Sequence, residues 1–554
     1  MKKLKSYMNN YGRAVLTDTG IMIKGQQSFP TDAEEASESS NVNPFADDED
    51  RETRNSFDTS SLISCVTCLS ESDSRADESS NGPLPNNTLI PYAKILYAKE
   101  VCAVSTELTP YRDEVGEQES TNAGETVLST LVEVTFARPR RHDLVPKKQL
   151  LCVGALPSGG NIVEEIMSRS YKGTKRDKAI LVIMNPHGGK GHAKKLYLTK
   201  VKPILAASNC TVETVETTYH GHATDLAKSV DADKFDIIAC ASGDGIPHEV
   251  LNGLFQRKDR ADAFNKLIIT QLPCGSGNAM SVSCHGTTNP SHAALNILKA
   301  PEIRIDLMCC SQPSYKDQPR LSFLSQTYGI IAESDVNTEF IRWMGPARFD
   351  LGVLLNILQR KKYPCEVHVK YAAKTKNELR EHYTYHKTKA HRNKSQETLD
   401  TSKQDDIDES AFELKYPLSD DIPADWETVD STLTNNLGIF YTGKMPYVAP
   451  DAKFFPAALP SDGTFDLIIT DSRTSLSRMV PILLSSDKGH HVLQPEVIHS
   501  KITAYKLIPK LKNSVISVDG EKFPFEPLQV EILPGVCRTL SFDGSYVETD
   551  FDSM

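Results

Sequence analysis

The sequence predicts an α/β unit with a parallel sheet, joined to a second part that is mostly β. Residues 178–300 repeat a pattern of apolar strand, glycine-containing loop and helix, which is typical of parallel β–α units. Residues 301–372 and 437–545 contain short runs in which apolar and polar residues alternate, such as LGIFYTG and FDLIITD. Residues 88–154 show the same alternation and predict a small β-rich module.

Residues 1–87 precede these units as an acidic tail. Ser, Asp, Glu and Asn dominate the tail, so it cannot bury enough apolar surface to fold, and we expect it to be disordered. Residues 31–80 hold 14 acidic and 3 basic residues, which accounts for the whole net charge of -11 and leaves 59 residues of each sign elsewhere. The neutral remainder does not support nucleic-acid binding, which calls for clustered lysines and arginines.

Cys65 and Cys68 lie in a short apolar patch of this tail, SSLISCVTCLSES. No second cysteine pair follows at a zinc-binding spacing, and the tail lacks the βαβ context of a redox motif. S-acylation of both cysteines would attach the chain stably to a membrane, and two unmodified thiols are the alternative. No apolar run reaches the ~18 residues of a membrane span, and a signal-peptide core is absent, so we expect a cytosolic protein.

Two other regions carry no predicted chemistry. The basic run RPRRHDLVPKK within residues 88–154 is interpreted as a solvated loop, with contact to anionic lipid or phosphate as the alternative. Residues 373–436 are polar and lack apolar periodicity, so we expect a disordered insert.

Three loops within residues 178–300 share one topological position. Residues 185–191 follow the strand AILVIM, residues 242–245 follow FDIIACA, and residues 273–278 follow LIITQL. Ligands of a parallel sheet bind beyond the carboxyl ends of its strands, so the three loops should converge on one crevice. Glycines let the backbone approach phosphate oxygens, and helix N-termini add unpaired N–H groups. The loops therefore predict a phosphate-binding crevice.

The common nucleotide motifs do not fit these loops. A Walker A loop requires Ser or Thr after its lysine, but Lys190 is followed by Gly191. A dinucleotide fingerprint requires a third glycine where Lys194 stands. The motifs therefore indicate neither a P-loop enzyme nor a nicotinamide dehydrogenase.

Asp244 is the candidate catalytic residue. It stands between Gly243 and Gly245 at the end of a strand, where a carboxylate has little packing value. Phosphoryl transfer needs a base for the acceptor hydroxyl, and Asp244 can be that base. The alternative is an aspartate favoured by turn geometry alone.

The motifs NPHGGKG, SGDGIPHEVLNGL and PCGSGNAM resemble the signature loops of diacylglycerol-kinase-like catalytic domains. The opening serine of SGDGI and the following HEVLNGL are the sphingosine kinase variant. The resemblance continues in GIIAESDVNTEFIRWMGPARFDLG, DKGHHV and VDGE, and it spans residues 178–372 and 437–545. Over these residues the sequence is similar to the long-chain base kinases of yeasts. It implies a two-lobed lipid kinase, with an N-terminal α/β nucleotide lobe and a C-terminal antiparallel β lobe that holds the lipid.

The resemblance also implies roles for individual residues. Asp244 would be the general base, and Asp335 would pair with the ammonium of a sphingoid base. Ser242, Gly243 and Gly245 would lie beside the substrate head group. Tyr219, His220 and Gly221 depart from the family's more usual Arg and Asn. The implied ATP-binding set is Asn185, Pro186, His187, Thr217, Thr218, Tyr219, His220, Gly221, Glu249, Gly275, Ser276, Gly277, Arg342, Arg348, Asp519 and Gly520.

The implied reaction is ATP-dependent phosphorylation of the primary hydroxyl of sphingosine, dihydrosphingosine or phytosphingosine, with Mg²⁺ as cofactor and no metal ligands assigned. A diacylglycerol or ceramide kinase is the first alternative, which Ser242 and Asp335 disfavour. A non-catalytic nucleotide-binding scaffold is the second, which the intact Asp244, Gly275 and Gly277 disfavour. The expected location is the cytoplasm and the cytosolic face of intracellular or plasma membranes, with the Golgi, endoplasmic reticulum and endosome as candidates. The preferred base and the oligomeric state, a homodimer included, stay open.

Overall fold

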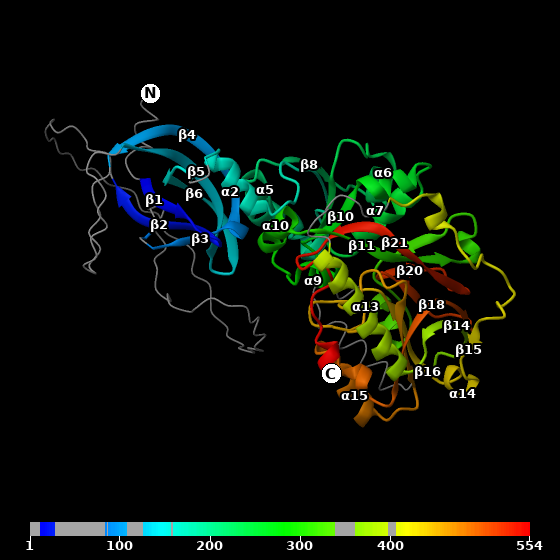
Figure 1. The fold of residues 1–554 in the computed structure, drawn as a ribbon. Coiled ribbons are helices and arrows are strands. Elements are labelled where there is room, and N and C mark those ends of the chain that lie inside the picture. Colours follow the sequence, from blue (N-terminus) through cyan, green and yellow to red (C-terminus); the bar gives the residue numbers. More distant parts are fainter. Residues whose placement is uncertain are drawn as a thin grey trace, which may run out of the picture. The chain divides into compact units, whose positions relative to one another are not determined.

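The computed structural model describes residues 11–27, 84–85, 87–107, 126–156, 159–337, 361–396 and 406–554. The chain divides into two compact units (Figure 1). The first comprises residues 1–90, 100–133 and 149–159, and the second comprises residues 91–99, 134–148 and 160–554.

The N-terminal strands form a six-stranded sheet in the order β3-β2-β1-β6-β5-β4. Strands lie where the alternation within residues 88–154 predicts them. The prediction of disorder over residues 1–87 is wrong for residues 11–27, which form the antiparallel pair β1–β2 with Ile21 and Ile23 buried. The polar composition of the segment as a whole hides this hairpin. Cys65 and Cys68 lie outside the described residues. The elements are β1 (Tyr11–Leu16), β2 (Gly20–Gln27), β3 (Leu89–Pro91), η1 (Tyr92–Lys94), β4 (Ile95–Glu107), β5 (Thr126–Arg140), β6 (Asp143–Gly154) and, after the sheet, α2 (Ile162–Tyr171).

The α/β lobe of the second unit is built on four parallel strands in the order β8-β7-β9-β10. They are β7 (Ala179–Met184), β8 (Thr211–Glu216), β9 (Ile237–Ser242) and β10 (Ile268–Pro273). The predicted parallel sheet is therefore confirmed. The helices between and after these strands are α3 (Gly188–Gly191), α4 (Ala193–Leu196), η2 (Tyr197–Val201), α5 (Lys202–Ala206), α6 (His222–Ser229), α7 (Gly245–Phe255), α8 (Arg260–Lys266), α9 (Ala279–His285) and α10 (Pro290–Lys299).

Both faces of the parallel sheet are covered, because successive side chains of a strand point to opposite faces. Leu181 and Ile183 of β7 belong to a core cluster that also holds apolar residues of α6, α7, α8 and α9. Ile180 and Val182 belong to a different cluster, with residues of α4, α5 and α10. The continuous apolar run of β7 follows from this two-sided burial.

The β lobe continues the same sheet with antiparallel strands, so that fifteen strands of the described chain form one sheet. The last strand, β21 (Leu528–Leu540), pairs with β11 along one edge, and with β18 and β10 at different points along the opposite edge. The predicted two-lobed fold is thus confirmed. The other strands of the lobe are β11 (Glu302–Ser311), β12 (Arg320–Ser322), β13 (Ser325–Gly329), β14 (Cys365–Ala373), β15 (Glu427–Thr428), β16 (Leu437–Gly443), β17 (Phe465–Asp471), β18 (Val497–Pro509), β19 (Ile516–Val518) and β20 (Glu521–Phe523).

The prediction of a disordered insert over residues 373–436 is wrong where the long helix α13 (Lys376–Gln396) lies. Leu379 and Tyr383, one turn apart, are buried in the β-lobe core, and Tyr383 contacts Phe551 edge-to-face with ring centroids 5.0 Å apart. Two apolar anchors in a helix this polar give too weak a periodicity for detection. The remaining helices are η3 (Pro313–Tyr315), α11 (Ile330–Asn337), η6 (Glu409–Phe412), α14 (Ser431–Thr434), α15 (Leu476–Leu484), η7 (Ser485–Asp487), η8 (His490–Leu493) and η9 (Phe551–Ser553).

The β lobe also encloses a buried ionic cluster, which we define as Asp306, Lys444, Asp462, Asp466, His499 and Lys501. Lys444 Nζ lies 2.7 Å from Asp306 Oδ2 and 2.5 Å from Asp462 Oδ1. Lys501 Nζ lies 2.8 Å from Asp466 Oδ2 and 3.3 Å from Asp462 Oδ2, and His499 Nε2 lies 2.6 Å from Asp466 Oδ1. Each buried carboxylate therefore has a cationic or ring N–H partner.

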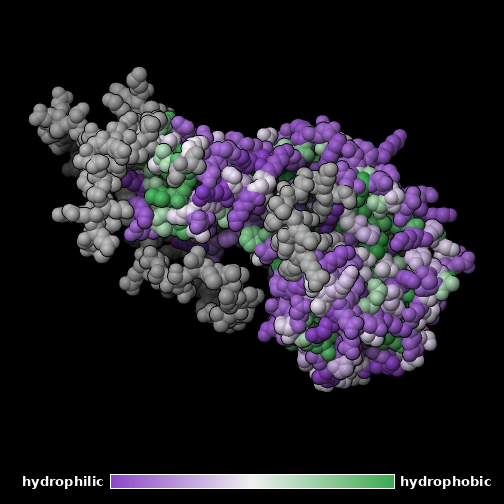
Figure 2. All heavy atoms as spheres, in the orientation of Figure 1, coloured by the Kyte–Doolittle hydropathy of each residue, from purple (hydrophilic) through white to green (hydrophobic). Residues whose placement is uncertain are grey.

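Hydrophilic residues cover most of the visible face of the second unit, with apolar atoms in scattered patches (Figure 2). Most of its large apolar side chains lie inside, in the core clusters of the two lobes. Within the described ranges, we find no helix with the length and apolar character required to cross a bilayer.

Candidate active site

The structure brings together the loops that follow β7, β9 and β10. A Cβ placed on Gly188, in the first loop, would lie 3.3 Å from the Ser242 hydroxyl at the end of β9. In the first loop itself, the His187 N–H donates to Asn185 Oδ1 at 3.0 Å, and the Gly188 N–H donates to the Asn185 carbonyl at 3.0 Å. The predicted convergence of the loops is therefore present.

Two glycines of the third loop are required by close packing. A Cβ on Gly275 would lie 2.2 Å from both the Cα and the nitrogen of Gly243, so the two loops meet backbone to backbone. A Cβ on Gly277 would lie 2.1 Å from Asp244 Oδ2. Any side chain at either position would displace the Asp244 loop.

Asp244 is half-buried at the start of α7, and neutral groups hold its carboxylate. Oδ1 accepts hydrogen bonds from the Ala279 N–H at 2.7 Å and from Gln271 Nε2 at 3.1 Å. Burial raises the pKa of Asp244 to about 6, against the lowering effect of these hydrogen bonds, and the nearby charge of Asp519 raises it further. A carboxyl with such a pKa is ionised near neutral pH and can still take up a proton, as a general base must.

Glu249 lies on α7 one turn beyond Asp244 and is occupied by the loop before α6. Its carboxylate accepts from the Gly221 N–H at 3.2 Å and from the Ala223 N–H at 3.0 Å. The side chain thereby caps the N-terminus of α6, a favourable place for a negative charge. Glu249 thus fixes the segment that contains the predicted adenosine-side residues.

The predicted adenosine-side residues have well-defined contacts of their own. Thr217 is buried, whereas the Thr218 N–H donates to His222 Nδ1 at 3.1 Å. Tyr219 stacks on His222 with ring centroids 4.5 Å apart, and its hydroxyl donates to Asp225 at 2.8 Å. The His220 side chain is exposed. Tyr219 is 56% exposed, so its ring is available to a planar ligand.

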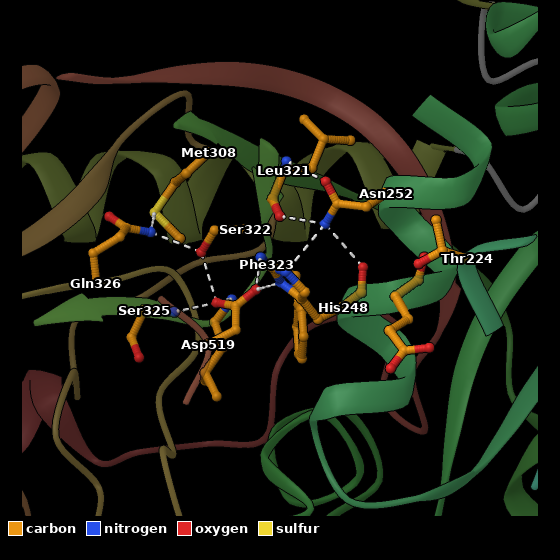
Figure 3. A network of polar contacts seen from close by, with 12 residues as sticks. Thr224, His248, Asn252, Met308, Leu321, Ser322, Phe323, Ser325, Gln326 and Asp519 are labelled. Atoms are coloured by element: carbon orange, nitrogen blue, oxygen red, sulfur yellow. Dashed lines mark hydrogen bonds and ion pairs between the residues drawn. The ribbon is translucent and has the colours of Figure 1, made fainter. Parts of the chain in front are cut away.

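Asp519 lies in the turn between β19 and β20, where it has φ 51 and Gly520 has φ 83. Figure 3 shows its carboxylate at the centre of a network of polar contacts. Oδ1 accepts from the Ser322 hydroxyl at 2.6 Å and from the Leu324 and Ser325 N–H groups. Oδ2 accepts from the Phe323 N–H at 3.1 Å and lies 2.8 Å from His248 Nδ1. Five donors therefore surround the carboxylate.

Two site residues were not identified from the sequence. Gln271 bridges the second and third loops, because Nε2 donates to Asp244 and Oε1 accepts from the Ser281 N–H at 2.9 Å. Glu521 reaches the Asp244 loop, since its Oε1 lies 3.1 Å from a Cβ placed on Gly245. In the sequence, Gln271 is recognisable as the polar residue inside the apolar run LIITQL, and Glu521 as the last residue of VDGE.

The donors at the crevice fit a Mg²⁺ ion that arrives with ATP. Magnesium in nucleotide sites keeps several waters and takes one or two carboxylates plus phosphate oxygens. Glu521 is partly exposed, and its Oε2 lies 3.8 Å from His220 Nε2. Among the described residues no three metal-ligating side chains gather, so the phosphates would have to complete the coordination.

Three predicted residues cannot be placed in the site. Asp335 belongs to α11, but its side chain lies outside the described part of the structure. Arg342 and Arg348 lie wholly outside the described residues.

Family models match both lobes. Residues 179–310 match the diacylglycerol kinase catalytic domain. Residues 436–541 match the YegS C-terminal NAD kinase beta sandwich-like domain. The two matches correspond to the α/β lobe with β11, and to the strands from β16 to β21.

Curated relatives extend the similarity to almost the whole chain. Sphingoid long chain base kinase 5 of Saccharomyces cerevisiae is 50% identical, over 98% of this chain and 97% of that protein. Sphingoid long chain base kinase 4 of Schizosaccharomyces pombe is 33% identical, over 68% of this chain and 78% of its own length. Sphingosine kinase 1 of Arabidopsis thaliana is 31% identical over 62% of this chain and 68% of its own. With its loops converging on Asp244 and this extent of identity, the chain belongs to the sphingoid long chain base kinase family of lipid kinases.

Proposed function

We propose that this chain transfers the γ-phosphate of ATP to the primary hydroxyl of a sphingoid long-chain base. The observation that carries the proposal is Asp244, which is held by Gln271 and Ala279 where three glycine loops converge. The relatives named as sphingoid base and sphingosine kinases support the substrate class. Sphingosine, dihydrosphingosine and phytosphingosine share the primary hydroxyl that would be phosphorylated.

In the proposed reaction, Asp244 accepts the proton of the hydroxyl as its oxygen attacks the γ-phosphorus. The new O–P bond forms while the bond from the γ-phosphorus to the bridging oxygen breaks, and ADP leaves. A base with a pKa of about 6 is mostly ionised at neutral pH and so is ready for this transfer. Ser242, Gly243 and Gly245, which neighbour Asp244 in the sequence, would lie beside the substrate head group.

The phosphates of ATP would bind over the glycine loops. Asn185, Pro186 and His187 would contact them from the first loop, and Gly275, Ser276 and Gly277 from the third. Thr217, Thr218, Tyr219, His220 and Gly221, braced by Glu249, would line the adenosine side. Glu521 would hold Mg²⁺ together with the phosphate oxygens, and the bound ion would neutralise their charge. Asp519 and Gly520 would contribute backbone atoms.

Discrimination between lipids would depend on charge. Asp335, one turn into α11, would pair its carboxylate with the ammonium of the sphingoid base, which diacylglycerol lacks. Arg342 and Arg348 would contact phosphate. A diacylglycerol kinase would have no use for a carboxylate at this point.

The test is transfer of labelled phosphate from ATP to dihydrosphingosine, phytosphingosine and diacylglycerol, by the full chain and by Asp244→Asn. We expect labelling of the sphingoid bases alone, and its loss in the variant. Labelling of diacylglycerol would move the assignment to the alternative kinase and remove the role of Asp335. Sphingoid labelling that survives Asp244→Asn would keep the function and remove Asp244 as the base.

We also propose that the kinase works as a peripheral protein on the cytosolic face of an intracellular or plasma membrane, such as the Golgi, endoplasmic reticulum or endosome. Its substrate is a lipid, and two acyl chains on Cys65 and Cys68 would suffice for stable attachment. Replacing both cysteines with serine should shift the protein from the membrane to the soluble fraction. Unchanged sedimentation with membranes would contradict acylation. Light scattering of the purified protein would decide whether it forms a homodimer.

A further inference from the structure

Helix α7 carries Asp244 and Glu249 toward the crevice and two other polar residues toward the β lobe. The latter are His248 and Asn252, one turn apart, and both are buried. Figure 3 shows them between α7 and the strand that contains Leu321. The reaction as proposed above uses neither residue.

Asn252 joins α7 to β12 by hydrogen bonds in both directions. Its Oδ1 accepts from the Leu321 N–H at 2.9 Å, and its Nδ2 donates to the Leu321 carbonyl at 2.9 Å. Nδ2 also donates to the carbonyl of His248 at 2.9 Å. The side chain therefore pairs with Leu321 as a neighbouring strand would, and its orientation is fixed by the partners.

His248 joins the same helix to the β19–β20 turn. Its Nδ1 lies 2.8 Å from Asp519 Oδ2, and its Nε2 faces the Asn252 amide nitrogen at 3.4 Å. Since a carboxylate oxygen accepts, the proton of this contact lies on Nδ1, which donates to Asp519. Asp519 in turn holds Ser322, Phe323, Leu324 and Ser325, the residues that connect β12 to β13.

The link reaches the catalytic carboxylate through one turn of helix. The His248 N–H donates to the Asp244 carbonyl at 3.3 Å, the first hydrogen bond of α7. A shift of the His248 side chain therefore moves the turn that carries Asp244. Glu521, two residues after Asp519, faces the same turn from the β lobe.

We propose that His248 is a positioning residue: through Asp519 it fixes the first turn of α7 against the β lobe, and so sets Asp244 at the distance from the lipid hydroxyl that transfer requires. Asn252 assists by anchoring the next turn to β12. This inference depends on the proposed function, because the position of Asp244 matters only if the β lobe holds the lipid and the α/β lobe holds ATP.

The experiment compares three variants of the full chain. His248→Leu removes the link to Asp519, whereas His248→Asn keeps an N–H on the same γ carbon, where Nδ1 stands. His368→Leu is the matched control: His368 is also buried, lies 3.0 Å from Glu366 and bonds to Thr428 at 2.9 Å, but it lies on β14, away from α7. kcat and the KM values for ATP and dihydrosphingosine are measured well below each variant's melting temperature.

We expect His248→Leu to lower kcat by about 10- to 100-fold with KM for both substrates within about threefold, because misplacement by about 1 Å has effects of this size. His248→Asn should stay within about threefold of the wild-type kcat, and His368→Leu should lower the melting temperature but not kcat. Equal kcat values for His248→Leu and His368→Leu would overturn the proposal, as would a His248→Asn as slow as His248→Leu.

If His248→Leu does not fold, Ser322→Ala provides a milder break, since it removes one of the five donors to Asp519. A lower kcat at unchanged KM would then support positioning, and an unchanged kcat would overturn it. A wild-type chain that transfers no phosphate to any sphingoid base would instead contradict the proposed function itself.

Discussion

Asp244 and the buried ionic cluster both remove carboxylates from water, but they do so with different partners. Asp244 has an amide side chain and backbone N–H groups, and burial raises its pKa to about 6. Asp466 has Lys501 and His499, and the charge of Lys501 holds its pKa below the ordinary range despite burial. Neutral donors leave a carboxylate able to exchange a proton, whereas paired cations keep it ionised.

The cluster also shows the limit of such pairing. Lys444 is shared between Asp306 and Asp462. The charges of Lys444 and Lys501 lower the pKa of Asp462, while burial and the charge of Asp462 raise the pKa of Asp306. Three carboxylates around two ammonium groups cannot all be matched equally.

The largest expected effect is that of Asp244→Asn on activity. Loss of the base should lower kcat by about 10²- to 10⁴-fold. The same variant should be more stable above pH 6 by about 1–2 kcal/mol, because each pKa unit corresponds to about 1.4 kcal/mol and the folded state must keep Asp244 ionised there. The gain should vanish below pH 4, where Asp244 is protonated in both folded and unfolded chains. Label transfer measures kcat, and thermal unfolding at two pH values measures the stability. A variant that is both inactive and less stable than the wild type above pH 6 would contradict the prediction.

Lys444→Met should give the opposite result. It leaves Asp306 and Asp462 buried without their shared cation, so the free energy of unfolding should fall by about 3–5 kcal/mol. Denaturant titration measures the loss. The control is Lys453→Met, since Lys453 is also buried but its Nζ donates to the single carbonyl of Thr549 at 3.1 Å. Equal losses in the two variants would mean that the ionic cluster is not specially dependent on its cations.

The two regions should also respond to acid at different pH values. Activity should fall about tenfold per pH unit as the pH drops below the Asp244 pKa of about 6, since only the ionised form accepts a proton. The pKa values of Asp462 and Asp466 are lowered by folding, so the stability they provide is present above their unfolded pKa of about 3.9 and is lost only as the pH falls through their lower folded values. Reversible inactivation near pH 5 without unfolding is expected. If activity and the circular dichroism signal of the folded protein were lost at the same pH, the two regions would not respond to acid separately.

The smallest expected effect is that of Gln271→Leu. It removes one neutral donor from Asp244, so the pKa of Asp244 should rise and kcat at neutral pH should fall by about two- to tenfold, the range of one hydrogen bond. The acid limb of the pH profile should shift upward. Gln312→Leu is the control, because Gln312 is buried and donates to the Pro524 carbonyl at 3.0 Å in the β lobe. If the acid limb of Gln312→Leu shifted as far as that of Gln271→Leu, the shift would not be due to the hydrogen bond with Asp244.

Local patterns predicted the parallel strands and the three loops, because a loop at the end of each strand needs no knowledge of the rest of the chain. They failed where the partners are distant. The carboxylate of Asp519 binds residues 322–325, and nothing near VDGE in the sequence indicates that contact. Helix α13 has only two buried anchors, Leu379 and Tyr383, among polar residues, which is too weak a pattern to predict it. The β1–β2 hairpin is hidden by the polar composition of the long segment that follows it in the sequence.

Strand β21 has a consequence for biosynthesis. It pairs with both β10 of the α/β lobe and β18 of the β lobe, so the sheet stays incomplete until residue 540 has been translated. A nascent chain that already contains all three glycine loops still lacks this strand and the Asp519 turn. The kinase should therefore acquire its activity late in synthesis, and premature termination before β21 should yield a chain unable to phosphorylate lipids.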